Sequence, residues 1–146
     1  MAILIDTNIL LRLLQPHHPH SAVAERAVRT LRTRNESLNV TPQNLMEFWA
    51  VATRPTSANG LGMTVEIALE ELAAFKRLFS VLPETASVLP EWERLVSTFQ
   101  VAGRNTHDAH IVAAMIAHGI SRILTFNVQD FARYSGIAAV HPTSVT

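Results

Sequence analysis

The sequence contains no cysteine, which excludes disulfides and thiolate metal sites and is compatible with a reducing cytoplasm. No apolar run reaches the roughly 18–20 residues that a membrane-spanning helix needs. The N-terminal segment MAILIDTNILLRLL is apolar, but an Asp and an Asn interrupt it, and it lacks a basic start and a small-residue cleavage site. We therefore expect no signal peptide, no membrane segment and a cytoplasmic location.

The sequence also lacks an excess of charge of either sign. Lys and Arg together number 12, as do Asp and Glu. This balance excludes a strongly basic protein that coats nucleic acid without regard to sequence. Lys76 is the sole lysine, and the remaining cations are arginines. Arg suits bidentate phosphate contacts, but genomic base composition is the better explanation of this bias.

What the chain does have is apolar material. Of its 146 residues, 48% are hydrophobic and 16% are charged, which is enough for a sizeable core and argues against disorder. We see no internal repeat or low-complexity tract. The length predicts one domain that comprises residues 1–146.

Short apolar runs alternate with helical patterns along the whole chain. The strands are expected at 2–5, 38–40, 81–82, 122–126 and 137–140. The helices are expected at 7–14, 21–34 with Ser21 as N-cap, and 42–53 with Thr41 as cap and Pro42 as first residue. Further helices are expected after the cap Thr64, at 89–101 with Gly103 as C-cap and at 106–119, with a helical turn at 128–134. Core candidates on the helix after Thr64 are Ile67, Leu69, Leu72, Phe75, Leu78 and Phe79. This alternation predicts an α/β fold with three layers, α/β/α, and a short, mainly parallel, Rossmann-like sheet.

Three acidic residues lie beside predicted strand ends or helix starts. Asp6 follows the first strand among apolar neighbours, Glu47 lies in the apolar helix segment NLMEFWAVA, and Asp108 lies in the first turn of THDAHIVAAMIAHG. Each has an ordinary alternative: Asp6 as a helix N-cap, Glu47 facing water, and Asp108 complementing a helix dipole. Because parallel sheets bind ligands at the carboxyl ends of their strands, we expect the three to gather there.

These motifs, in this order, resemble the PIN-domain family. The likeness rests on ILIDTNIL, a Glu on the helix after the second strand, RNTHDAHIVAAMIAHG and ILTFNVQDFARY, and it is greatest for the VapC-like toxins of toxin–antitoxin pairs. The resemblance implies a Mg²⁺- or Mn²⁺-dependent endoribonuclease with Asp6, Glu47 and Asp108 as catalytic metal ligands. It also implies RNA as substrate, a cognate antitoxin as partner and a homodimer.

A fourth acid usually follows the late strand in this family. Here Asn127 occupies that place, and Asp130 comes three residues later. We expect Asp130 in the outer part of the site, with Asn127 as the alternative. Thr7, Asn8 and Thr125 are short polar residues beside strand ends, and they are expected either to orient ligands and waters or to act as caps.

Other residues are candidates for smaller roles. Arg54 is a candidate RNA phosphate contact, or else a partner of its helix dipole. A solvated turn is expected for the histidine segment 17–20, and a place on the helix surface for His107 and His110. The large aromatic residues, expected in the core or an interface, are Trp49, Trp92, Phe75 and Phe79.

Two rival functions remain open at this point. A haloacid-dehalogenase-type phosphohydrolase also begins with an Asp after its first strand, but it needs a second Asp two residues on, where this chain has Asn8. The other rival is a catalytically weak or inactive PIN-like protein that binds RNA or a partner, and the uncharged Asn127 keeps this hypothesis alive.

Overall fold

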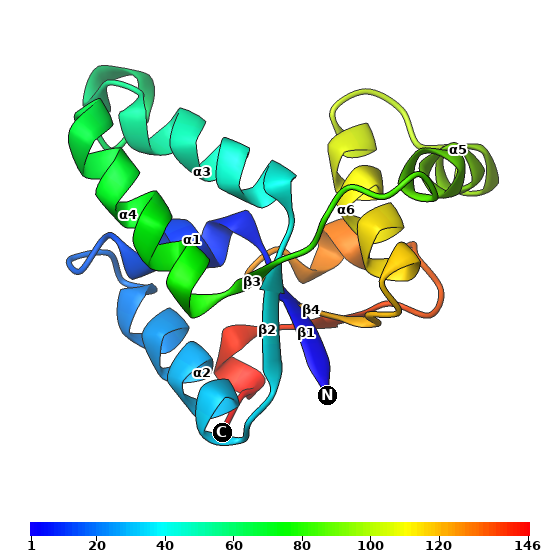
Figure 1. The fold of residues 1–146 in the computed structure, drawn as a ribbon, viewed down its shortest axis with the longest axis horizontal. Helices are drawn as coiled ribbons and strands as arrows, with labels where there is room; N and C mark the ends of the chain where they lie inside the picture. The colour runs from blue at the N-terminus through cyan, green and yellow to red at the C-terminus, as the bar shows by residue number, and fades with distance from the viewer.

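A computed structural model describes all 146 residues and contains one five-stranded sheet (Figure 1). The strands are β1 (Ala2–Ile5), β2 (Ser37–Val40), β3 (Ser80–Val81), β4 (Arg122–Leu124) and β5 (Ala138–Val140). The helices are α1 (Thr7–Leu13), α2 (Ser21–Thr33), α3 (Pro42–Thr53), α4 (Val65–Leu78), α5 (Val88–Thr98) and α6 (Asn105–Ala117), with 3₁₀ turns η1 (Thr56–Ala58), η2 (Val128–Phe131) and η3 (Pro142–Ser144). No helix has both the length and the apolar character that a membrane crossing requires.

All the strand pairs are parallel, and the strand order is β3-β2-β1-β4-β5. β1 therefore lies between β2, which follows it in sequence, and β4, which comes more than 80 residues after β2. The chain moves outward from β1 in one direction through β2 and β3, and then returns to the other side of β1 through β4 and β5. Such a reversal of direction opens a crevice at the carboxyl ends of the central strands.

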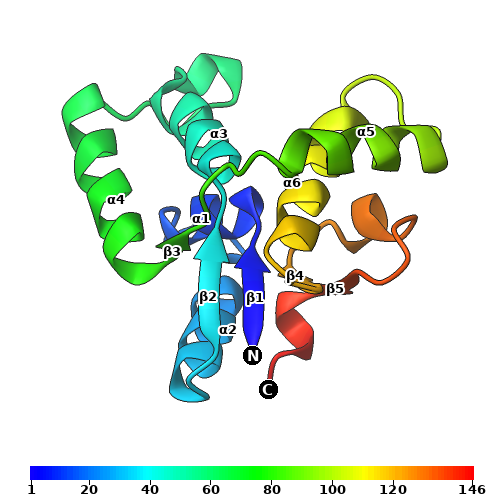
Figure 2. The same ribbon diagram turned by 45° about the vertical axis from the view of Figure 1, so that its right-hand side comes forward.

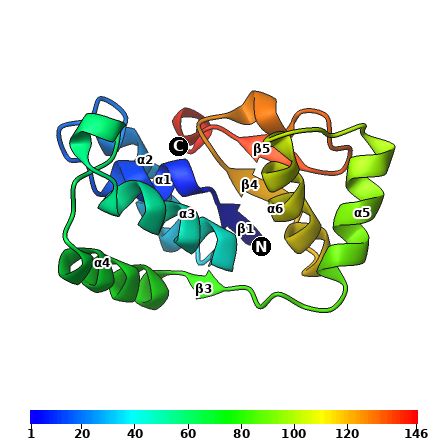
Figure 3. The same cartoon turned by 90° about the horizontal axis from the view of Figure 1, so that it is seen from above.

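The helices cover the two faces of the sheet in separate groups. Figure 3 shows α1 to α4 on one side of β1 and α5 and α6 on the other. Alternate residues of the buried strand β1 serve both layers: Ile3 and Ile5 pack with the first group, and Leu4 packs with the second. The predicted α/β/α architecture is thus confirmed, with a sheet that is entirely rather than mainly parallel.

Three local predictions about helix ends and strand length were wrong. Ser21 is the first residue of α2 rather than its N-cap, because hydrogen-bonded turns bring His20 into the helical conformation before the helix starts. α5 ends at Thr98, and Gln100 adopts the left-handed conformation there, so Gly103 instead belongs to the turn before α6. β4 ends two residues early, because the Thr125 hydroxyl accepts a hydrogen bond from the Asn127 N–H and turns the chain.

Two core predictions on α4 were also wrong. Ile67 and Leu69 are about half exposed, at 46% and 52%. α4 is an outer helix that packs on α3 through the stripe of Ala68, Leu72 and Phe75, so the positions beside that stripe face away from the core. Phe75 and Phe79 are buried as predicted, and Leu72 and Leu78 are partly buried against the same core.

Candidate active site

The carboxyl ends of β1, β2 and β4 meet at one edge of the sheet. Figure 2 shows the arrows of β1 and β2 pointing to the edge where α1 and α3 begin. Asp6 follows β1, Thr41 follows β2 and Thr125 follows β4. Because β1 pairs with both β2 and β4, these three polar residues belong to neighbouring strand ends at the crevice.

Asp6 is the most deeply buried acid of the cluster, with 8% of its surface exposed. Its Oδ1 accepts a hydrogen bond from the Thr7 N–H at 2.8 Å, and its Oδ2 accepts one from the Thr125 hydroxyl at 2.7 Å. The pKa of Asp6 is raised to about 6, chiefly by burial and in smaller part by the charges of Asp108 and Glu47, despite the two hydrogen bonds, which lower it. Asp6 is also the N-cap of α1, so the same carboxylate caps a helix and belongs to the acid cluster.

Glu47 faces Asp6 from α3 rather than facing bulk water. Its Oε1 accepts a hydrogen bond from the Thr7 hydroxyl at 3.0 Å, and the Thr7 oxygen accepts one from the Asn44 amide at 3.0 Å. Asn44 is fully buried and forms a capping box with Thr41 at the start of α3. The chain Asn44–Thr7–Glu47 therefore fixes α3 against α1 and holds the Glu47 carboxylate in place.

Asn44 is a site residue that the sequence analysis missed. The available signal was its position three residues after Thr41, where a capping box places its second member. The box usually carries Glu or Gln at that position, and here Asn performs the role through its Oδ1, which accepts from the Thr41 N–H at 2.9 Å.

Asp108 approaches the cluster from the other face of the sheet, in the first turn of α6. It is partly buried, and desolvation raises its pKa to about 6. The neighbouring charges of Asp130 and Glu47 also raise this pKa, whereas His107 and Arg133 lower it. The charges of Glu47 and Asp108 therefore act on Asp6, and those of Glu47 and Asp130 act on Asp108, so the structure brings together the acids that the sequence singled out.

Short polar residues connect the ends of β1 and β4. Asn8 donates to the Thr125 hydroxyl at 3.2 Å and accepts from the Phe126 N–H at 3.3 Å. Thr125 is fully buried and donates to Asp6, so it orients that carboxylate. The side chains of Asn127, just before η2, and Asp130, within η2, are exposed, and only the Asn127 N–H joins this network, through its bond to the Thr125 hydroxyl.

The donor set fits a hard divalent cation. Every candidate ligand is a carboxylate oxygen, and two of the carboxyl groups have raised pKa values, so a positive charge between them would relieve their repulsion. The side chains as placed form no ready-made ligand group, because no three His, Asp or Glu side chains stand close enough to hold one ion. A cation would therefore have to draw the carboxylates inward or bind them through water.

The remaining candidates lie outside the acid cluster. Arg54 is exposed at the C-terminal end of α3, seven residues beyond Glu47. The histidine segment forms a turn as predicted, in which the His20 ring stacks on Phe126 with ring centroids 4.8 Å apart. His107 is exposed on α6, but His110 bridges Gln43 of α3 and Glu84 of the β3–α5 segment, a link that the sequence did not reveal.

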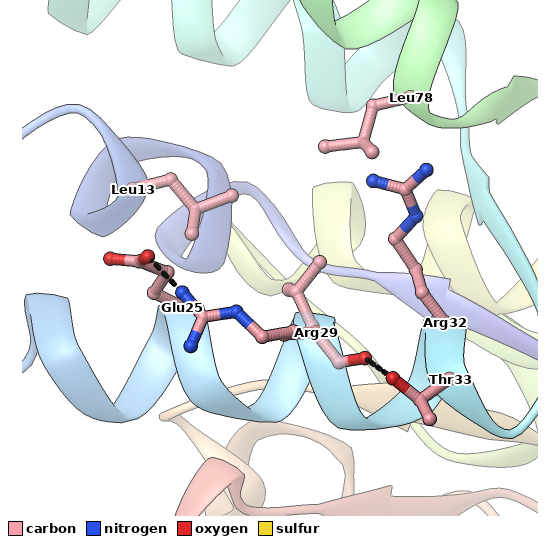
Figure 4. A pocket seen from close by; sticks show the side chains of 7 residues that line it. Leu13, Glu25, Arg29, Arg32, Thr33 and Leu78 are labelled. Atoms are coloured by element: carbon pink, nitrogen blue, oxygen red, sulfur yellow. Dashed lines mark hydrogen bonds and ion pairs between the residues drawn. The ribbon is translucent and has the colours of Figure 1, made fainter.

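A hollow of about 500 Å³ lies away from these acids, between α1, α2 and α4. Figure 4 shows its lining: Glu25 pairs with Arg29, the Thr33 hydroxyl bonds to the Arg29 carbonyl, and Arg32 extends toward Leu78. None of the clustered acids lines it. This hollow and the acid cluster are therefore separate features of the molecule.

Comparison with known proteins supports the α/β/α fold and identifies its family. Residues 3–137 match the PIN domain family. VapBC2 from Rickettsia felis, solved with a promoter DNA fragment, matches with a TM-score of 0.75 and 16% identity over 97% of this chain and 98% of the matched chain. VapBC-1 from nontypeable Haemophilus influenzae matches with a TM-score of 0.74 and 16% identity over 99% and 100% of the two chains.

A third solved structure, VapC20 from Mycobacterium tuberculosis, is described as a toxin that cleaves the sarcin–ricin loop. It matches with a TM-score of 0.58 and 21% identity, over 83% of this chain and 86% of its own. A comparison with curated protein sequences finds no match to this chain. Because the family match extends over residues 3–137 and the fold agrees throughout, this chain belongs to the PIN domain family.

Proposed function

We propose that this protein is a metal-dependent endoribonuclease that cleaves RNA phosphodiester bonds. The observation that carries the proposal is a set of four acids linked through their charges at the carboxyl ends of the central strands, namely Asp6 after β1, Glu47 on α3, Asp108 on α6 and Asp130 on η2. The pKa values of Asp6 and Asp108 are both about 6. Holding the buried Asp6 carboxylate near the half-buried carboxylates of Glu47 and Asp108 is costly unless a cation binds among them. The cluster therefore lowers the stability of the metal-free fold, which favours a functional site over an ordinary set of helix caps.

Within this proposal, Asp6, Glu47 and Asp108 hold Mg²⁺ or Mn²⁺, and Asp130 acts from the outer edge. The metal, when bound, supplies an activated water and stabilises negative charge on the phosphate. The protein's own part is positioning. Thr125 and the Thr7 N–H fix both oxygens of Asp6, and the Thr7 hydroxyl fixes Glu47. Asn127, three residues before Asp130, offers a neutral carbonyl oxygen to a ligand water.

The biological role that fits best is the toxin of a toxin–antitoxin pair, acting on RNA in the cytoplasm. The support is the fold shared with VapBC complexes and with a toxin that cleaves the sarcin–ricin loop. A cognate antitoxin that binds and inhibits this protein, and a homodimer, belong to the same proposal. Exposed apolar side chains on α3 and α4, such as Met46, Val65 and Leu69, offer surface that a partner would cover.

The rival functions have less support. Asn8 bonds to Thr125 and to the Phe126 N–H, so it joins two strand ends and does not present the second catalytic Asp of a haloacid-dehalogenase-type site. A binding-only PIN protein is the stronger rival, because Asn127 carries no charge. Under that alternative, Mn²⁺ would bring no thermal stabilisation, since nothing would bind it in the folded state.

The test is cleavage of a mixed pool of structured RNAs by the purified protein, with Mg²⁺ or Mn²⁺ and with EDTA as the control. The proposal expects cleavage with metal and none with EDTA, together with a rise in melting temperature on adding Mn²⁺. In folded Asp6→Asn the rise should disappear. Absence of both cleavage and metal-induced stabilisation in the parent protein would favour the binding-only alternative.

A further inference from the structure

A second hollow, of about 300 Å³, lies between α5, the start of α6 and the segment that joins β3 to α5. Its lining consists of Glu84, Leu89, Trp92, Thr106, His107 and His110. Its volume is at the lower end of the range for small-molecule sites. His107 connects it to the cluster, because it is the neighbour of Asp108 in α6 and its charge acts on the Asp108 carboxylate.

Hydrogen bonds hold the walls of this hollow. The Trp92 indole N–H donates to the Thr106 carbonyl at 2.9 Å, which fixes α5 against the start of α6. Gln43 donates to the His107 carbonyl at 3.0 Å and also contacts the His110 ring, whose other nitrogen lies 2.8 Å from Glu84. Gln43 is in the first turn of α3, one helical turn before Glu47, so it links this hollow to the helix that carries the second acid.

The lining matches a nucleobase better than a phosphate. It contains no Lys or Arg, and Glu84 would repel an anion. Trp92 and Leu89 offer apolar walls, and Leu89 is 61% exposed, which no packing requirement of α5 explains. The imidazoles add flat polar surfaces, and the Glu84 carboxylate can accept hydrogen bonds from ring and amino N–H groups such as those of guanine.

We infer that this hollow binds one unstacked nucleobase of the RNA, next to the phosphate that is cleaved. The inference rests on the proposed function. It adds recognition of the base, which the acid cluster cannot provide because carboxylates and a metal ion do not distinguish one base from another. Bases turned out of a stack are commonly held between aromatic and apolar side chains and recognised along their hydrogen-bonding edges. Guanine should be preferred over uracil because its adjacent N1–H and 2-amino groups can both donate to the Glu84 carboxylate, whereas uracil has a single N–H flanked by two carbonyls.

The experiment measures binding without cleavage. In a Trp49→Phe background Trp92 is the sole tryptophan, and its fluorescence is titrated in EDTA with guanosine 5′-monophosphate, uridine 5′-monophosphate and ribose 5-phosphate. The last probe keeps the sugar and phosphate but lacks the base. The guanosine nucleotide should bind at least about tenfold more tightly than ribose 5-phosphate, as expected for base stacking on an aromatic wall.

Two variants test whether the nucleotide binds in this hollow. Leu89→Ala should weaken binding of the guanosine nucleotide about fivefold or more. The matched control, Leu69→Ala on α4, changes a leucine that is 52% exposed and does not line the hollow, and it should leave binding unchanged. Equal affinity for ribose 5-phosphate and the nucleotide, or an unaffected Leu89→Ala, would overturn the inference. If RNA is cleaved but no nucleotide binds, the inference alone fails; if the nucleotide binds but no RNA is cleaved, the proposed function alone fails.

Discussion

Asp6 and Asp108 are the two acids of the cluster whose carboxyl groups differ clearly from ordinary ones. Both carboxyl groups have a pKa of about 6, chiefly because burial disfavours their ionised forms. Asp6 is held by hydrogen bonds from Thr7 and Thr125, so its burial is not accidental. Near neutral pH both groups are largely ionised. Because their pKa values in the folded protein lie above the ordinary value of 3.8, ionisation of each group lowers the free energy of unfolding.

The raised pKa of Asp108 predicts that Asp108→Asn stabilises the metal-free protein at high pH. The folded state holds the Asp108 proton up to about pH 6, whereas the unfolded state loses it near pH 3.8, so the free energy of unfolding falls as pH rises through that window. The Asn side chain cannot ionise and avoids this loss. In EDTA the variant should therefore melt at a higher temperature than the parent at about pH 8, and the gain should shrink as the pH falls toward 4.

The control for that measurement is Glu66→Gln, which neutralises an exposed acid in the first turn of α4. It removes a favourable interaction with a helix dipole and should give no stabilisation at either pH. A stability difference between Asp108→Asn and the parent that does not depend on pH would contradict the raised pKa.

Thr7 offers a test of how Glu47 is held. Thr7→Val removes the hydroxyl that donates to Glu47 and accepts from the buried Asn44 amide. Leaving that amide without a partner should cost about 1–2 kcal/mol of unfolding free energy, measured by urea denaturation. The kcat for RNA cleavage should fall about tenfold or more with a smaller change in KM, because a catalytic group is misplaced. Thr7→Ser restores the hydroxyl and should recover kcat; a Thr7→Ser variant as slow as Thr7→Val would show that the methyl group matters instead.

For individual residues, the sequence predicted which acids lie close together but not how they are held. Asp6, Glu47 and Asp108 stood out because each is an isolated acid beside a strand end or in an apolar segment. The bridging roles of Thr7 and Asn44 depend on the contact of α1 with α3, residues about 40 apart in sequence, and no local pattern reports such a contact. For the same reason the link from His110 to Gln43 and Glu84 was not foreseen.

Among the elements, α3 is the one that the site depends on most. It begins at the carboxyl end of β2, presents Glu47 to the crevice, and is fixed at its first turn by the Thr41–Asn44 capping box. Because Thr41 and Asn44 are both buried, the box is an internal anchor as well as a helix cap. α4, by contrast, begins at the exposed Thr64, whose hydroxyl accepts one bond from the Ile67 N–H.

The two caps make a matched pair of variants. Thr41→Ala should lower the free energy of unfolding by about 2 kcal/mol, since it removes a cap and leaves buried partners unpaired. Thr64→Ala should cost about 0.5–1 kcal/mol, as expected for an exposed cap. Urea denaturation measures both, and equal losses would mean that burial adds nothing to the Thr41 box.

Element positions were largely predictable because hydrophobic periodicity and Thr-Pro or Thr caps are local signals. Thr41 and Thr64 cap α3 and α4 as predicted. The failures at Ser21, Gly103, Ile67 and Leu69 have a common cause. Each depends on what lies next to the residue in space, namely the hydrogen-bonded turn before α2, the left-handed Gln100 after α5, and the position of α4 outside α3.

For the whole molecule, the decisive feature is the return of the chain to the second side of β1. A parallel α/β sheet follows from the alternation of elements, but the order β3-β2-β1-β4-β5 does not, because several orders satisfy the same local pattern. That order puts Asp6 between the ends of β2 and β4 and allows helices from both faces to contribute acids.

The exposed apolar surface between α3 and α4 bears on the oligomeric state of the whole molecule. A groove of about 470 Å³ between α3 and α4 has Leu45, Met46, Trp49 and Leu72 in its lining, and Met46 is 69% exposed. We predict that the isolated protein is a homodimer, and that Met46→Glu shifts it toward a monomer that remains folded by circular dichroism and has a somewhat lower melting temperature, because the stabilisation by dimerisation is lost. Size-exclusion chromatography with light scattering measures both states. A parent protein that remains monomeric at high micromolar concentration would contradict the prediction.

The most direct test of the central claim is a comparison of RNA cleavage by Asp108→Ala and Glu66→Ala, each confirmed as folded by circular dichroism. Both remove an acid from the first turn of a helix, but only Asp108 belongs to the cluster. The account predicts that Asp108→Ala, like Asp6→Ala, abolishes Mg²⁺-dependent cleavage and that Glu47→Ala nearly does. Asp130→Ala should retain measurable activity, Asn127→Asp should preserve or increase it, and Glu66→Ala should match the parent. Cleavage by folded Asp108→Ala at the parent rate would show that the acid cluster is not the active site.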